Sequence, residues 1–232
     1  VPYHQTPHFL GRKDITSSLI KQLTSGHSCY LYGIGGIGKT EIAKSVLKQI
    51  LAISSSSSGF THIMWVNCTD GDFALSLVRA LNLDEHINNL EQAFQKALSI
   101  INQYHENLLL IIDNVENAED IHLPRLCEYL SCRFLITSRC EAFPSLTKMP
   151  VPPLSENDCM TLFYSYYLGQ KDDIILRKII QLADRHTVTI ELLAKIADSE
   201  EVLLYEFYDS LVQCGFHIST EEVSTVHEKM QS

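Results

Sequence analysis

Residues 33–40, with the sequence GIGGIGKT, constrain this chain more than any other segment. They follow a short apolar run, 28–33 (SCYLYG), and lead into residues 39–52, where apolar side chains recur at helical spacing. A strand, a glycine-rich turn and a helix in this order fit the pattern G-x-x-x-x-G-K-[ST], whose backbone N–H groups cradle phosphate oxygens. The segment therefore predicts an α/β domain with a phosphate-binding loop after its first strand.

Each residue type in this loop has a physical reason. Glycine has no Cβ, so the backbone can turn sharply and approach an anion closely. Lys39 supplies a positive charge for the β- and γ-phosphates, the Thr40 hydroxyl suits Mg²⁺, and the start of the following helix adds a partial positive charge. The candidate ligand-binding residues are Gly33, Gly35, Gly36, Ile37, Gly38, Lys39, Thr40 and Glu41.

Two further strand ends carry groups that suit a triphosphate. The apolar run 107–113 (NLLLIID) ends in Asp113, and a P-loop enzyme needs an acidic residue at such a position to hold Mg²⁺. The run 132–139 (CRFLITSR) places Thr137, Ser138 and Arg139 at the carboxyl edge of the sheet, where ligands bind in open α/β folds. An arginine there is placed to contact a γ-phosphate.

The pattern of elements changes near Pro153. Up to that point strands alternate with helices, which predicts a parallel sheet covered by helices on both faces. After it only helices are predicted. We therefore expect a P-loop NTPase domain over residues 1–152 and a small all-helical lid subdomain over 153–232. The other predicted strands are 61–68 and 148–153, and the other predicted helices are 72–82, 88–105, 155–168, 172–184, 187–198 and 200–213.

Cysteine, histidine and hydropathy patterns exclude several classes of protein. The seven cysteines are scattered without a CxxC pair, which argues against a disulfide framework or a zinc site and favours a reducing cytosol. No apolar run reaches the ~18–20 residues of a membrane-crossing helix. No secretory leader is recognisable. We expect a cytoplasmic protein that does not bind membranes.

Charge is unevenly distributed along the chain. The net charge is −10, yet residues 1–50 carry six Lys and Arg against two Asp and Glu. Between Lys195 and Lys229 there are eight acidic residues and no basic one. A surface that binds duplex DNA needs clustered Lys and Arg, so nucleic acid is not expected as a partner.

Several motifs together resemble the NB-ARC-like STAND NTPases, over residues 9 to about 213. They are FLGRKD (9–14), GIGGIGKT (33–40), LLLIIDNVEN (108–117), RFLITSR (133–139) and VPPLSENDCMTLF (151–163). The resemblance implies an AAA+-related nucleotide switch of signalling or defence proteins, held closed by ADP and opened by ATP. It also implies self-oligomerisation of the full-length protein with ATP, and a monomeric fragment with ADP.

The same resemblance assigns roles to individual residues. Lys39 and Thr40 are expected to bind phosphate and Mg²⁺, and Asp113 to hold Mg²⁺ through water. Arg139 would sense the γ-phosphate. Adenine is expected rather than guanine, because no NKxD-type motif is present. The residues that match the segment flanking adenine and ribose are Phe9, Leu10, Gly11 and Arg12.

Two departures from the family pattern bear on mechanism. The aspartate that usually follows the Mg²⁺ aspartate is Asn114, and an amide cannot accept a proton, so hydrolysis should be slow unless Glu116 acts instead. In the lid, Arg185 and Thr187 replace the glycine and proline of the family motif. His186 between them is either a ligand for the β-phosphate or an ordinary histidine at a helix start.

The sequence favours a slow, Mg²⁺-dependent ATP/ADP switch core that belongs to a longer protein. Two alternatives remain at this point. An AAA+ ATPase of the DNA-loading or remodelling type would share the loop, although it would favour a second acid at position 114 and basic surfaces. A P-loop kinase would favour several lid arginines, and the chain after residue 153 holds only Arg177 and Arg185.

Overall fold

The computed structural model divides the chain into two compact units, each described here by itself. The described residues are 6–53, 59–68, 72–83, 89–116, 121–140, 143 and 145–217. The first unit contains residues 13–33 and 39–151, and the second contains 6–12, 34–38 and the chain from 152 onward. The second unit thus includes two short segments, 6–12 and 34–38, that the sequence analysis placed in the N-terminal domain.

The first unit is built on a five-stranded sheet whose paired strands all run parallel, in the order β2-β3-β4-β1-β5. This confirms the predicted parallel α/β sheet. The strands are β1 (Cys29–Tyr32), β2 (His62–Asn67), β3 (Leu108–Val115), β4 (Arg133–Ser138) and β5 (Thr147–Pro150).

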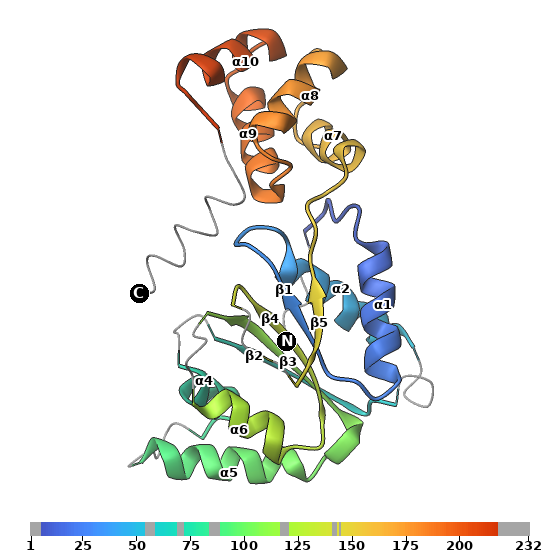
Figure 1. Cartoon of the computed structure of the whole chain (residues 1–232), viewed down its shortest axis with the longest axis vertical. Coiled ribbons are helices and arrows are strands. Elements are labelled where there is room, and N and C mark those ends of the chain that lie inside the picture. The colour runs from blue at the N-terminus through green and yellow to red at the C-terminus, as the bar shows by residue number, and fades with distance from the viewer. Residues whose placement is uncertain are drawn as a thin grey trace. The chain divides into compact units, whose positions relative to one another are not determined.

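Helices cover both faces of this sheet, as Figure 1 shows. On one face, alternate residues of β3 join a buried cluster with α4 (Phe73–Ala80), α5 (Leu90–Asn102) and α6 (His122–Tyr129). On the other, α1 (Lys13–Thr24) and α2 (Lys39–Ala52) contact β1, β3 and β4. Almost every residue of β3 is buried, because side chains of a covered parallel strand pack on both faces. A 3₁₀ turn, η2 (His105–Asn107), precedes this strand.

Two helices of the first unit, α1 and α6, were not predicted. Only Thr16, Leu19 and Leu23 of α1 are buried, so its apolar stripe is too sparse to stand out in the sequence. Helix α6 is short and contains Pro124 at its third position. Proline is tolerated in the first turn, where the backbone N–H has no intrahelical acceptor.

The second unit contains four helices in its described part, at the predicted places. They are α7 (Glu156–Tyr164), α8 (Asp173–Leu182), α9 (Thr187–Ser199) and α10 (Leu204–Gln213). Side chains of all four share one buried core, and the Tyr167 hydroxyl donates to the Val202 carbonyl at 2.9 Å. Ser155 and Asp172 cap α7 and α8 through side-chain oxygens that accept backbone N–H bonds. Among the helices of the described residues, none has the length and apolar character needed to cross a membrane.

Candidate functional site

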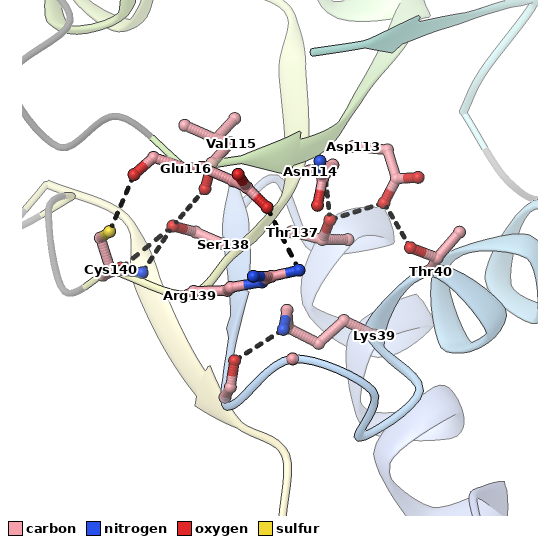
Figure 2. A network of polar contacts seen from close by, with 12 residues as sticks. Lys39, Thr40, Asp113, Asn114, Val115, Glu116, Thr137, Ser138, Arg139 and Cys140 are labelled. Carbon is pink, nitrogen blue, oxygen red and sulfur yellow. Dashed lines mark hydrogen bonds and ion pairs between the residues drawn. The ribbon is translucent and has the colours of Figure 1, made fainter. Parts of the chain in front are cut away.

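The carboxyl ends of β1, β3 and β4 bring the predicted polar residues of the first unit together. Strand β4 pairs with β1 on one side and β3 on the other, so Ser138 lies opposite both Tyr32 and Val115. Lys39 follows the loop that leaves β1, whereas Asp113 and Arg139 come from the ends of β3 and β4. Figure 2 shows these side chains and the polar contacts that each of them makes.

Asp113 is buried and is held by two hydroxyl groups. Its Oδ1 accepts hydrogen bonds from Thr40 Oγ1 at 2.9 Å and from Thr137 Oγ1 at 2.6 Å (Figure 2). A carboxylate beside a threonine hydroxyl is the oxygen donor set of a Mg²⁺ site, which needs few protein ligands when phosphate and water supply the rest. Within the described residues no group of three or more His, Cys, Asp or Glu side chains is arranged for a metal. Asp113 and Thr40 therefore fit Mg²⁺ and would supply its protein ligands.

Lys39 is buried, with 8% of its surface exposed, and its Nζ donates to the Gly33 carbonyl at 2.6 Å. Burial, together with the positive charge of Arg139, lowers the pKa of Lys39 to about 8, although Asp113 and Glu116 partly oppose this shift. Two neighbouring cations, one of them desolvated, are stabilised by an anion. This part of the site fits a phosphate group.

The end of β4 contacts the end of β3 through an ion pair and through hydrogen bonds from side chains to backbone carbonyls. Arg139 Nη2 lies 3.2 Å from Glu116 Oε1, and both side chains are about one third exposed. The Cys140 thiol donates to the Glu116 carbonyl at 3.1 Å, and the Ser138 hydroxyl donates to the Val115 carbonyl at 2.9 Å (Figure 2). The candidate γ-phosphate sensor and the candidate base are thus neighbours.

Asn114 interrupts the regular pairing of β3 with β4. Its φ is +65°, and the register of the two strands shifts between Ile112 and Val115. The Asn114 N–H donates to Thr137 Oγ1 at 2.8 Å instead of to a ladder carbonyl. Asparagine adopts this left-handed conformation more readily than most residues, which gives a local conformational reason for an asparagine here.

The glycine loop, residues 34–38, is described with the second unit. Gly36 and Gly38 have φ values of +73° and +103°, which L-residues rarely adopt. Three successive loop carbonyls accept hydrogen bonds from residues of the same unit. Gly35 O accepts from His186 Nε2 at 2.6 Å, and Gly36 O accepts from the Val188 N–H at 3.3 Å. Ile37 O accepts two bonds, from Arg12 Nη2 at 2.9 Å and from Thr187 Oγ1 at 3.3 Å.

The structure places His186 against the loop backbone. It is buried, and its second ring nitrogen, Nδ1, lies 2.7 Å from Thr189 Oγ1. A contact between His186 and a β-phosphate remains a prediction, since both ring nitrogens here have protein partners. Thr189 was not predicted as a site residue, because a threonine three residues after a histidine carries no recognisable signal in a sequence.

The segment expected along adenine and ribose makes several contacts within the second unit. Leu10 packs against its apolar core, and a Cβ on Gly11, whose φ is +64°, would lie 2.5 Å from Asp158 Oδ2. Arg12 is buried, and its Nη1 donates to the Pro152 carbonyl at 2.6 Å. Phe9 is half-buried. An adenine contact by these residues remains a prediction.

Glu41 was predicted as a ligand-binding residue, whereas the linking role of Thr137 was not predicted. Glu41 forms an ion pair with Lys44 at 2.7 Å in the first turns of α2, so its expected role at the ligand remains a prediction. Thr137 links the Asp113 carboxylate to the Asn114 backbone, and its place in the ITSR segment is the only sequence signal for that role.

Comparisons with known proteins give one family and a set of structural relatives. The family model described as NB-ARC domain matches residues 12–173, more than half of the chain. No curated protein matches the chain.

The structural relatives share the fold at low sequence identity. Drosophila ORC bound to DNA has a TM-score of 0.62 at 14% identity, covering 95% of this chain and 64% of that chain. The Aeropyrum pernix ORC1 protein in complex with DNA has 0.60 at 14%, covering 97% and 66%. The Aeropyrum pernix ORC2 protein, in ADPNP-ADP complexes, has 0.55 at 16%, covering 98% and 70%. The chain thus spans slightly less than two thirds of the length of the first two structures.

Proposed function

The chain belongs to the NB-ARC domain family and is a nucleotide-binding P-loop NTPase, and from that premise we propose that it is an ATP/ADP switch. In this proposal it binds ADP or ATP with Mg²⁺, hydrolyses ATP slowly, and forms the regulatory core of a cytoplasmic STAND protein in signalling or defence. ATP binding drives oligomerisation of the full-length protein, and the ADP-bound chain is monomeric.

One observation carries the nucleotide site. Lys39, whose pKa is lowered by burial and by Arg139, lies near enough to Asp113 for the two charges to interact, and two threonine hydroxyls orient the Asp113 carboxylate. The two cations would neutralise the phosphates, and the carboxylate with Thr40 would hold Mg²⁺. When bound, Mg²⁺ would supply charge neutralisation at the phosphate oxygens.

Slow turnover follows from the residues available to activate water. Asn114 can orient a water molecule but cannot accept its proton. Glu116 can accept a proton, but its carboxylate is already engaged in an ion pair with Arg139 at 3.2 Å. A switch that remains in one state for long periods needs no faster chemistry.

The proposal is tested by calorimetric titration of the chain with ADP, ATP and GDP in the presence of Mg²⁺. We expect ADP to bind and GDP to bind at least tenfold more weakly. Lys39→Ala should weaken ADP binding at least tenfold, because a charge-assisted contact contributes roughly 1.5–3 kcal/mol. Lys48→Ala is the matched control, since Lys48 is an exposed lysine of the same helix. Equal affinity of wild type and Lys39→Ala for ADP contradicts the proposed site.

A second candidate is a DNA-binding AAA+ ATPase, because two of the structural relatives are ORC proteins in complex with DNA. The charge of the chain argues against DNA binding, because a DNA-binding surface needs clustered Lys and Arg. The net charge is −10, and the segment between Lys195 and Lys229 holds eight acidic residues and no basic one. Fluorescence anisotropy with a labelled duplex at 50 mM salt separates the two candidates. Saturable binding that weakens steeply with salt supports the DNA-binding candidate, and no binding with ADP or ATP present supports the switch.

A further inference from the structure

The three loop carbonyls of Gly35, Gly36 and Ile37 all receive donors from the second unit, of which the loop is a part. Two of the donors come from the first two residues of α9, one from its N-cap residue His186, and one from Arg12. A glycine-rich loop is conformationally permissive, so such bonds decide which of its many conformations is occupied.

The direction of these carbonyls also sets the direction of the loop's N–H groups. No peptide bond in the described chain is cis, and in a planar trans peptide the C=O and the following N–H point in opposite directions. Fixing Gly35 O, Gly36 O and Ile37 O therefore points the N–H groups of Gly36, Ile37 and Gly38 away from α9 and Arg12. Loop N–H groups are the groups that bind phosphate in a P-loop.

We infer that His186, together with Thr187 and Arg12, is a positioning residue that holds the loop carbonyls and so presents the loop N–H groups to the nucleotide phosphates. This inference rests on the proposed nucleotide binding. It differs from a direct contact between His186 and phosphate, because here the imidazole acts through the backbone of Gly35.

Hydrogen-bond chemistry defines how His186 does this. A carbonyl oxygen only accepts, so the proton of the 2.6 Å contact with Gly35 O resides on Nε2. In the neutral ring Nδ1 is then an acceptor, and the Thr189 hydroxyl donates to it at 2.7 Å. His186 and Thr189 are each only 8% exposed, so water competes little for either bond. Thr189 thereby fixes both the ring orientation and the tautomer.

The ring also limits the space beside the loop. A Cβ built on Gly36 would lie 2.8 Å from His186 Cε1 and 2.9 Å from Nε2. The imidazole is thus packed directly against the Gly36 backbone, and the loop cannot shift toward it. The packing of the ring against Gly36 and its hydrogen bond to Gly35 O therefore restrict the peptide group that joins these two glycines.

The experiment compares variants by calorimetric titration with ADP and Mg²⁺, with circular dichroism to confirm that each is folded. We expect His186→Ala to bind ADP about tenfold more weakly, the equivalent of one hydrogen bond supporting a charged ligand. His186→Gln keeps an N–H donor that can extend toward Gly35 O, and it should remain within about threefold of wild type. Leu192→Ala is the matched control, because Leu192 lies in the second turn of α9 and is 52% exposed.

The outcomes separate a positioning role from a purely structural one. A folded His186→Ala protein with wild-type ADP affinity overturns the inference, as does a His186→Gln protein as weak as the alanine variant. If His186→Ala does not fold, the isosteric Thr189→Val carries the test: about threefold weaker binding is expected, and unchanged binding overturns the inference. A wild-type chain that binds no ADP instead refutes the proposed function itself.

Discussion

The Thr137 hydroxyl donates a 2.6 Å hydrogen bond to Oδ1 of Asp113 and accepts one of 2.8 Å from the Asn114 N–H. Thr137 lies on β4, and the two residues it binds lie on β3, so a single buried hydroxyl joins two neighbouring strand ends. The hydroxyl orients the candidate Mg²⁺ ligand and satisfies a backbone N–H where the pairing of β3 with β4 shifts register.

Thr137→Val keeps the volume of the side chain and removes both bonds. The Asn114 N–H would lose its acceptor and Asp113 would lose a donor, so the free energy of unfolding should fall by ~1–3 kcal/mol. The Mg²⁺ concentration needed for half-maximal ADP binding should rise roughly tenfold, because groups that orient a metal ligand affect metal affinity. Urea denaturation and Mg²⁺ titration measure the two effects. Thr161→Val, which removes an exposed hydroxyl bonded to the Asn157 carbonyl, is the control and should change neither.

The lowered pKa of Lys39, about 8, predicts a pH dependence of ADP binding. Above this value the free chain loses the Lys39 proton, and an anionic ligand raises the pKa and draws the proton back. ADP affinity should therefore fall as the pH rises above 8, with uptake of ~0.7 proton on binding at pH 8.5. Calorimetry at pH 8.5 in buffers of different ionisation enthalpy measures this uptake, which Lys39→Ala should abolish. Proton uptake of the same size in that variant would assign the effect to another group.

The same pKa predicts a change in the stability of the nucleotide-free protein. The unfolded chain keeps the Lys39 proton up to its ordinary value near 10.5, whereas the folded chain releases it near 8. The unfolded state thus binds more protons in this window, and the contribution of Lys39 to stability increases between about pH 8 and 10.5. Comparing the pH dependence of urea denaturation for wild type and Lys39→Ala isolates this contribution.

Arg139→Ala should reduce ATP affinity about tenfold while leaving ADP affinity within threefold, if Arg139 contacts only the γ-phosphate. The control is Arg133→Ala, at the opposite end of β4, where Arg133 pairs with Glu106 at 3.2 Å. It should leave the ratio of the two affinities unchanged. Parallel losses of ATP and ADP affinity in Arg139→Ala would show that this arginine does not distinguish the two nucleotides.

Wild-type ATP turnover should be well below the ~10 s⁻¹ of a median enzyme. Asn114→Asp restores a proton acceptor, and aspartate also tolerates a φ of +65°, so the variant should fold and hydrolyse ATP about tenfold faster or more. Phosphate release under saturating ATP provides the rate. Glu116→Gln should abolish the residual activity only if Glu116 is the working base. A wild-type chain that turns over many times per second is incompatible with this view of the site.

Arg185→Gly should stabilise the second unit. Arg185 follows α8 with a φ of +54° and is exposed, and its N–H donates to the Ile180 carbonyl at 3.2 Å. Glycine adopts this conformation without steric cost. The strain relieved in the folded state outweighs the extra entropy that glycine loses on folding, so the free energy of unfolding should rise by ~0.5–1 kcal/mol. Thermal denaturation should show a higher midpoint. Arg177→Gly is the opposite control, because it places glycine inside α8 and removes the ion pair with Glu156.

The sequence by itself determined the local elements and revealed the P-loop pattern. Alternating and helical apolar patterns depend on residues a few positions apart, so the strands, most helices and the GIGGIGKT loop could be recognised without any tertiary information. The P-loop and the carboxyl ends of the strands gave the expectation that Asp113 and Arg139 lie near a triphosphate, and the family resemblance added their individual roles. Helix α1, with three buried residues, and α6, a short helix with a proline in its first turn, lacked a sufficient local signal.

Only the tertiary structure decided which side chains meet. The strand order places β4 between β1 and β3, and this alone makes Thr137 a partner of Asp113 and Arg139 a neighbour of Lys39. The bond from His186 to Gly35 joins residues 151 positions apart. Such contacts arise from burial of apolar surface between whole elements, and no pattern within a short window of sequence encodes them.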